Sequence, residues 1–198
     1  MTAYASVAQV KAALRITDSV DDALIEMARV AASDLIDGYC GRTFSPSGTV
    51  TRYFAPFDNY ILQVDDIAGT ALTILSSTGA DGVFDVTWKV SDYQLEPLNG
   101  VSNGQVVPYT RIRAVNDYLW PANGGEASVK ITGVFGFTAA PGVITQATVL
   151  QASRIFTRLQ SPLGVAGFGE MGVVRVTRAL DPDVAALVEP YRRMAGVA

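Results

Sequence analysis

The stretch Asp18–Arg42, DSVDDALIEMARVAASDLIDGYCGR, decides the fold of the first part of the chain. Apolar residues recur along it at helical spacing, with polar residues on the opposite side, which predicts one amphipathic helix. We expect it to begin at the capping-box pattern Ser19-x-x-Asp22 and to end at Gly41, because glycine accepts the left-handed conformation. The residues expected on the buried face are Leu24, Ala28, Ala31, Leu35 and Tyr39, with Met27 beside them.

Two further helices are predicted around this one. Ser6 and Gln9 form another capping-box pattern, and the short helix that follows should stop near Arg15, so residues 4–40 form an αα-hairpin. A long third helix should begin at Pro141, since proline suits the first turn of a helix. We expect the hairpin and the third helix to share a core that contains Leu24, Met27, Leu35, Val149, Ile155 and Phe156.

The segment between these helices is predicted to be β-structure. Apolar and polar residues alternate most clearly in 84–90 and 127–135. Weaker strand patterns cover 49–55, 60–65, 71–76, 92–96 and 109–115, separated by Gly, Pro, Asn and Asp. Many short strands in about 95 residues favour an antiparallel sandwich or small barrel.

The predicted fold class is therefore α+β, a small helical domain with an inserted antiparallel β-domain and an extended C-terminal arm. The expected divisions are 1–44 with 141–160 for the helical domain, 45–140 for the β insertion and 161–198 for the arm. The arm begins with a glycine-rich run, continues through a β-prone segment and ends in a short helix that Pro182 begins and Pro190 interrupts.

The arm offers a candidate docking surface for a partner. Its glycines leave the backbone free to follow a partner, its valines can add a strand to a partner sheet, and its arginines can pair with acidic groups. The final helix presents an apolar face that nothing obvious in the chain covers. The candidate docking residues are Phe168, Met171, Val173, Val174, Arg175, Val176, Arg178, Val184, Leu187, Val188 and Tyr191.

Charge is distributed unevenly in a chain whose net charge is −4. Residues 1–149 carry 9 basic and 15 acidic residues, a balance of −6, and residues 150–198 carry 6 and 4, a balance of +2. Non-specific binding to nucleic acid is not expected from this balance. No apolar run approaches the ~18 residues of a membrane helix, so no membrane contact is expected. The lone Cys40 is expected to be a small buried residue.

The sequence lacks the usual equipment of an enzyme. It contains no histidine, no cysteine cluster, no Walker-type loop and no Gly-x-Ser-x-Gly. The run 167–172 matches G-x-G-x-x-G, but the predicted order is helix before and strand after, the reverse of a dinucleotide site. We therefore expect no catalytic residues, no cofactor and no metal.

Two clusters of side chains have both a structural and a functional interpretation. Tyr53, Phe54, Phe57 and Tyr60 pack in a core or form a sugar-binding platform. The acidic cluster on and before the long helix is a solvated helix face, or it contributes to an electronegative surface, such as the lumen of a ring, past which DNA slides. The acidic residues are Asp18, Asp21, Asp22, Glu26, Asp34 and Asp37.

A short helix followed by a DDALIE…AASDLIDGYCGR helix resembles the N-terminal half of the head–tail connector (adaptor) proteins of long-tailed bacteriophages. The segment from Ser161 through the glycine-rich run to VVRVTR resembles the end of longer connectors from phages of actinobacteria. The resemblance implies a virion structural protein at the head–tail interface, assembled in the host cytoplasm. It also implies a cyclic ring, usually dodecameric, beneath a portal protein, with a stopper or other tail-side partner and DNA only as passing cargo.

Two alternatives stay open on the sequence alone. In the first, the β segment is a carbohydrate- or receptor-binding module of a tail structure. In the second, the chain is an enzyme whose catalytic groups are carboxylates only.

Overall fold

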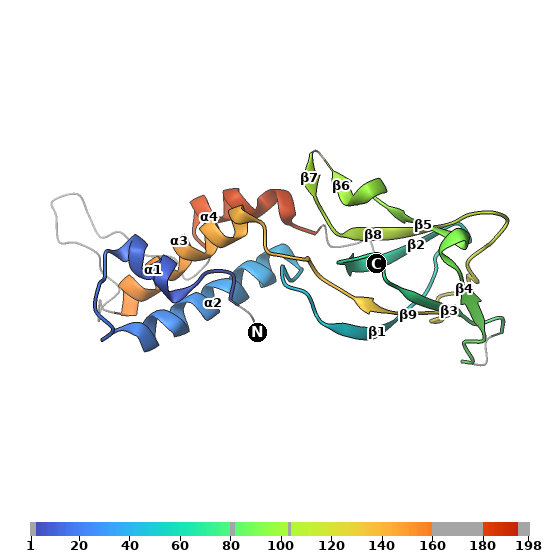
Figure 1. The fold of residues 1–198 in the computed structure, drawn as a ribbon, viewed down its shortest axis with the longest axis horizontal. Helices are drawn as coiled ribbons and strands as arrows, with labels where there is room; N and C mark the ends of the chain where they lie inside the picture. The colour runs from blue at the N-terminus through green and yellow to red at the C-terminus, as the bar shows by residue number, and fades with distance from the viewer. Residues whose placement is uncertain (1–2, 80–81, 103, 160–179, 194–198) are drawn as a thin grey trace. The chain divides into compact units, whose positions relative to one another are not determined.

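The computed structural model describes residues 3–79, 82–102, 104–159 and 180–193. The described chain forms two compact units (Figure 1). The helical unit combines the residues up to Phe44 with those from Ala140 to Arg193, and the β unit is the segment Ser45–Ala139 between them.

The helical unit contains α1 (Val7–Leu14), α2 (Asp22–Cys40), α3 (Gly142–Leu159) and α4 (Pro182–Val188), followed by the 3-10 turn η3 (Glu189–Tyr191). α3 packs against the other three helices. The core joins the two ends of the sequence, because Ile25 and Ala28 of α2 are buried with Ala152 and Phe156 of α3. The N-terminal hairpin and α3 therefore share one core, as the sequence predicts.

Among the described helix ends, the caps expected at Ser6 and Gly41 are formed, and the one expected at the start of α2 is not. The capping box of Ser6 is formed, with the Gln9 backbone N–H donating to the Ser6 hydroxyl over 3.2 Å, and Gly41 ends α2 at φ +63°. The prediction for the start of α2 is wrong. The N-cap is Asp21, whose side chain makes no capping bond, and the Asp22 carboxylate accepts instead from Lys11 Nζ at 2.6 Å.

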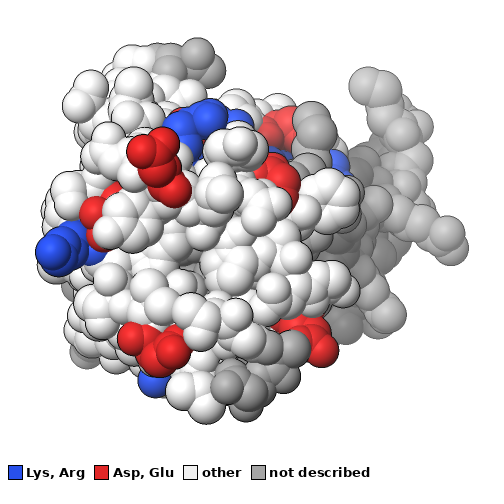
Figure 2. Space-filling view, turned by 90° about the vertical axis from the view of Figure 1, so that its right-hand side faces the viewer, with Lys and Arg blue, Asp and Glu red and all other residues white. Residues whose placement is uncertain are grey.

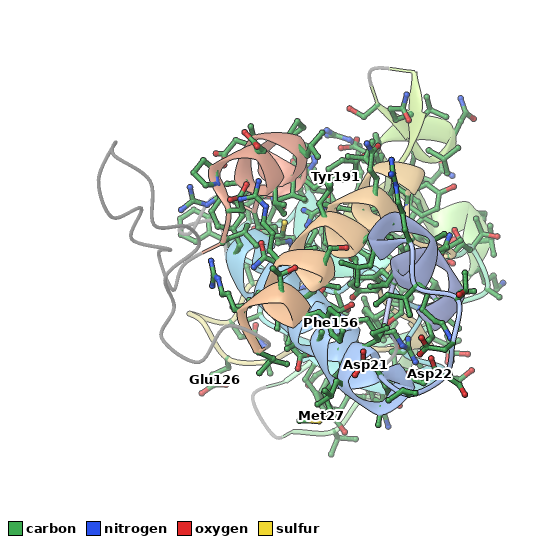
Figure 3. The ribbon with its side chains drawn as sticks, turned by 90° about the vertical axis from the view of Figure 1, so that its left-hand side faces the viewer. Asp21, Asp22, Met27, Glu126, Phe156 and Tyr191 are labelled. Carbon is green, nitrogen blue, oxygen red and sulfur yellow. The ribbon has the colours of Figure 1, made fainter. Side chains whose placement is uncertain are left out.

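The buried face predicted for α2 is right at Ala28 and otherwise wrong by about one residue. The residues that α2 buries are Ile25, Ala28, Ala32, Ser33, Ile36 and Cys40. Leu24 and Leu35 are each 39% exposed and Met27 is 65% exposed. Figure 3 shows Met27 at the outer edge of α2 and Phe156 between the helices. One residue turns a helix by about 100°, and α2 has apolar residues on both faces, so periodicity alone did not decide between them.

The β unit contains two antiparallel sheets and a small hairpin. One sheet has the order β1 (Thr49–Phe54), β9 (Val129–Val134), β3 (Thr73–Ser76) and β4 (Val86–Trp88). The other has the order β2 (Ile61–Ile67), β8 (Tyr109–Ala114) and β5 (Tyr93–Glu96). β6 (Val101–Ser102) and β7 (Gln105–Val106) form the hairpin, and the short 3-10 turns η1 (Val90–Asp92) and η2 (Leu98–Gly100) flank β5.

Both sheets contribute to one core. Ile74 and Ile131 of the first sheet and Leu62 and Ile112 of the second are fully buried in it. Trp120, on the segment after β8, is also fully buried and its ring stacks on Trp88 with centroids 3.8 Å apart. The α+β class is confirmed. In the described residues the two sheets do not close into a barrel. A single isolated β-bridge, between Ile67 and Phe135, connects them.

The two strands predicted most clearly differ in outcome. β9 alternates between buried and half-buried residues, as predicted for 127–135. β4 covers only three residues of the predicted 84–90. It ends because the Asp92 carboxylate accepts from the Lys89 backbone N–H at 2.8 Å and holds the chain in the turn η1.

Candidate assembly surfaces

Two acidic residues of α2 are occupied by partners within the helical unit. Asp22 pairs with Lys11 of α1, and Glu26 forms two contacts of 2.6 Å with Arg29 one turn later. Arg29 also donates to the Ala5 carbonyl over 3.0 Å. These carboxylates therefore attach α1 and the N-terminal segment to α2.

Asp37 has a structural partner as well. Its carboxylate accepts from the Tyr4 hydroxyl at 2.7 and 2.8 Å, and the same hydroxyl accepts from the Phe44 backbone N–H at 2.9 Å. Burial raises the pKa of Asp37 to about 6; the Tyr4 hydrogen bond lowers this pKa and the nearby Asp34 raises it. Asp37 therefore belongs to an internal network that links Tyr4, α2 and Phe44.

The remaining acids do not form one surface with these three. Asp18 accepts from the Val20 backbone N–H at 3.0 Å, next to Asp21, whereas Asp34 is exposed thirteen residues further along the chain. Thirteen residues of helix correspond to about 20 Å. Of the six acidic residues, Asp22, Glu26 and Asp37 therefore stabilise the fold. Asp18 and Asp21 lie at the start of α2, and Asp34 lies far from them in its second half.

The final helix is covered by its own chain, contrary to the expectation of an unpartnered apolar face. Val184 and Val188 of α4 are fully buried, and α4 packs against α3 and α2. The Cys40 thiol lies 3.8 Å from the Val188 carbonyl, and the Arg193 backbone N–H donates to the Cys40 carbonyl over 2.8 Å. The apolar periodicity predicted for α4 is present, and the helical unit covers this apolar face.

Polar contacts hold α4 and η3 in this position. Asp181 caps α4 by accepting from the Asp183 backbone N–H at 3.1 Å, and it pairs with Arg154 of α3. At the other end Glu189 accepts from the Tyr39 hydroxyl. Tyr191 packs edge-on against Phe44, with ring centroids 5.8 Å apart. Leu187 and Tyr191 are half-buried, so the described end of the predicted arm is part of the helical unit.

The other candidate arm residues lie outside the described residues. They are Phe168, Met171, Val173, Val174, Arg175, Val176 and Arg178.

The exposed side of α2 is an apolar row that the sequence analysis assigned to the core. Leu24, Met27 and Leu35 follow helical spacing, and each is exposed. The signal that could have separated the two faces is residue size. The buried face is rich in small residues, Ala28 and Ala32 among them, which let α3 approach closely.

The four clustered aromatics of the β unit do not form one platform. Phe54 is half-buried and stacks on Phe135, whereas Tyr53 points to the other side of β1 and its ring lies 5.5 Å from Phe84. Phe57 and Tyr60 lie in the following turn and are 99% and 62% exposed.

Neither a metal site nor a membrane segment is present in the described part of the chain. No group of three or more Cys, Asp or Glu side chains there is placed to hold a metal ion. None of its helices is both long and apolar enough to cross a membrane.

Residues 4–70 match the family model of the phage gp6-like head-tail connector proteins. The match covers α1, α2 and the first two strands, and it confirms the resemblance to head–tail connectors on the part of the chain that carries it. A comparison with curated protein sequences gave no match.

Two solved structures share the fold. A chain in the neck of an empty GTA particle is 21% identical with a TM-score of 0.57, and the comparison covers 98% of this chain and 92% of that chain. A chain in the virion of a native gene transfer agent (GTA) particle is also 21% identical, with a TM-score of 0.51 and the same coverage. Because the superposition extends over nearly the whole of both chains, it includes both units of the fold.

Proposed function

We propose that this chain is a virion structural protein, a head–tail adaptor that forms a ring beneath the portal, links head to tail and lets DNA pass. The observation that carries the proposal is the family match over residues 4–70. Whole-chain similarity to chains from the neck and the virion of GTA particles supports it.

The proposed partners are a portal protein on the head side, a stopper or other connector on the tail side, and further copies of the chain. A role as an enzyme is not part of the proposal. The carboxylates of Asp22, Glu26 and Asp37 are engaged in structural contacts, and adjacent pairs such as Asp21 and Asp22 point in different directions on a helix.

Portal contact is assigned to the part of the arm that α4 does not include. Arg175 and Arg178 are bidentate donors for acidic groups, and Val173, Val174 and Val176 are β-prone residues suited to extending a partner sheet. Reversing both charges with Arg175→Glu and Arg178→Glu should weaken joining to portal-containing heads in part, while the protein keeps its melting temperature.

The central experiment is deletion of the gene in the virus or particle system that encodes the chain. We expect DNA-filled heads and free tails that do not join, and electron microscopy of complemented particles should show a closed ring of this chain at the neck. Complete particles in the absence of the chain would contradict the proposal.

A further inference from the structure

The loops at one end of the β unit carry an exposed apolar surface, here called the tip patch. Its five residues are large and lie on three loops, the turn between β1 and β2, the turn η1 and the segment after β8. They are Phe57, Tyr60, Val90, Tyr118 and Leu119, exposed by 99, 62, 76, 41 and 50%. Contiguous exposed apolar surface on a soluble protein marks an interaction site.

Hydrogen bonds join the three loops that carry the tip patch. The Trp120 backbone N–H donates to the Asn59 carbonyl over 2.7 Å, and the Asn59 side-chain amide donates back to the Trp120 carbonyl over 3.0 Å. The Asn116 side-chain amide donates to the Ser91 carbonyl over 2.9 Å. The patch is therefore one composite surface.

The tip patch is supported from beneath by a packed aromatic layer. Trp120 is fully buried and stacks on Trp88, and the ring of Tyr118 lies 5.4 Å from that of Trp88. The Asp58 carboxylate accepts from the backbone N–H groups of Tyr60 and Ile61, both at 2.7 Å, and fixes the turn. A pre-ordered surface of this kind loses little conformational freedom when a partner binds.

The charge around the tip patch defines the chemistry of its partner. Among the described residues of the loop segments 55–60, 77–85, 89–92 and 115–128, the exposed charges are four acids and one base, a balance of −3. They are Asp58, Asp85, Asp117, Glu126 and Lys89. Figure 2 shows this end of the β unit as a broad uncharged area, with acidic groups on several sides of its margin and fewer basic groups among them. Phosphates of DNA and a second tip of the same charge are disfavoured here, and a basic partner is favoured.

We propose that the tip patch binds another protein of the particle, one that presents apolar side chains bordered by Lys and Arg. The inference rests on the proposed function for the existence of such a particle. The aromatic residues Phe57, Tyr60 and Tyr118 fill apolar hollows of the partner and act as anchors, since interfaces concentrate their binding energy in such side chains. Asp58 and Asp117 steer the approach of the basic rim.

The first test locates the partner inside assembled particles. Leu119 is replaced by the photoreactive residue p-benzoylphenylalanine, and the control carries it at Val106, which is 75% exposed on β7. Irradiation should crosslink position 119 to a different protein, at a peptide that contains Lys or Arg beside apolar residues. The control at position 106 should not crosslink to that peptide. Joining of position 119 only to another copy of this chain, or to nothing, overturns the proposal.

The second test measures assembly. Phe57→Ser with Tyr118→Ser should reduce the yield of complete particles at least tenfold, and the control pair Leu98→Ser with Val106→Ser should leave it unchanged. Asp117→Lys with Glu126→Lys should reduce the yield several-fold and alter its salt dependence. Unchanged yields, or saturable binding of an oligosaccharide that Phe57→Ser abolishes, overturn the proposal.

The outcomes separate the two proposals. If the chain is absent from particles, the proposed adaptor function fails. If the chain is present at the neck but position 119 contacts no other protein, the adaptor function stands and the tip proposal alone fails.

Discussion

At the scale of single residues, the Tyr4 hydroxyl holds three parts of the helical unit together, because it donates to Asp37 and accepts from the Phe44 backbone. Tyr4→Phe should lower the free energy of unfolding by about 1–3 kcal/mol, the cost of leaving buried polar groups unsatisfied. Urea denaturation measures this. Tyr39→Phe is the matched control, since its hydroxyl bond to Glu189 is exposed, and an equal loss in both variants would contradict the assignment.

The carboxyl group of Asp37 should make stability depend on pH in a defined direction. Its pKa is raised from 3.8 to about 6 in the folded protein, so the folded state binds more protons than the unfolded state between these values. The contribution of Asp37 to stability is therefore greatest below pH 4 and is lost as pH rises through about 6. Asp37→Asn should flatten the unfolding free energy measured from pH 4 to pH 7, and an unchanged slope would show that Asp37 is not responsible.

At the scale of elements, adjacent residues of α2 provide a direct test of which face is buried. Ile36 is fully buried and Leu35 is 39% exposed. Ile36→Asp should destabilise the protein by about 3 kcal/mol or more, since it places a charge in the core, and Leu35→Asp should cost less than about 1 kcal/mol. Thermal unfolding of the two variants measures the difference. A larger loss of stability for Leu35→Asp would show that the face predicted from the sequence is the buried one.

The last helix should be part of the cooperative structure. Val184→Asp places a carboxylate at a fully buried position on α4 and should lower the melting temperature by roughly 10 °C or more. Ala186→Asp changes an exposed position of the same helix and is the control. Truncation before Val173 should be destabilising for the same reason, and a truncated protein with an unchanged melting temperature would contradict the packing of α4.

The sequence predicted the helices, most strands and the α+β class because capping residues, glycine and alternation are local signals. β9 and the Ser6 capping box illustrate this. It did not predict which face of α2 is buried, because Leu24 and Ile25 are equally apolar and only the approach of α3 distinguishes them. It also placed Val184 on an open surface, because the cover comes from helices that lie far away along the chain. The tip patch depends on three loops meeting, which no local pattern reports.

At the scale of the whole molecule, the isolated chain is expected to be monomeric or weakly associated at micromolar concentration and to form rings only in the particle. The exposed row of Leu24, Met27 and Leu35 is one helix face, and stable interfaces bury about 800 Å² per partner, more than a single helix face offers. Analytical ultracentrifugation tests this. A closed dimer that persists at nanomolar concentration would contradict it.

The division of the helical unit between the two ends of the chain has a consequence for synthesis on the ribosome. The hairpin of α1 and α2 emerges first, but its core partner α3 follows only after the whole β unit has been made. At about 5–20 residues per second, the roughly 120 residues from the end of α2 to the end of α3 take about 6–24 s. During that interval Ile25 and Ala28 lack their α3 partners Ala152 and Phe156, and only the N-terminal segment and α1 cover them, so the nascent hairpin is a natural client for chaperones while the β unit folds ahead of it.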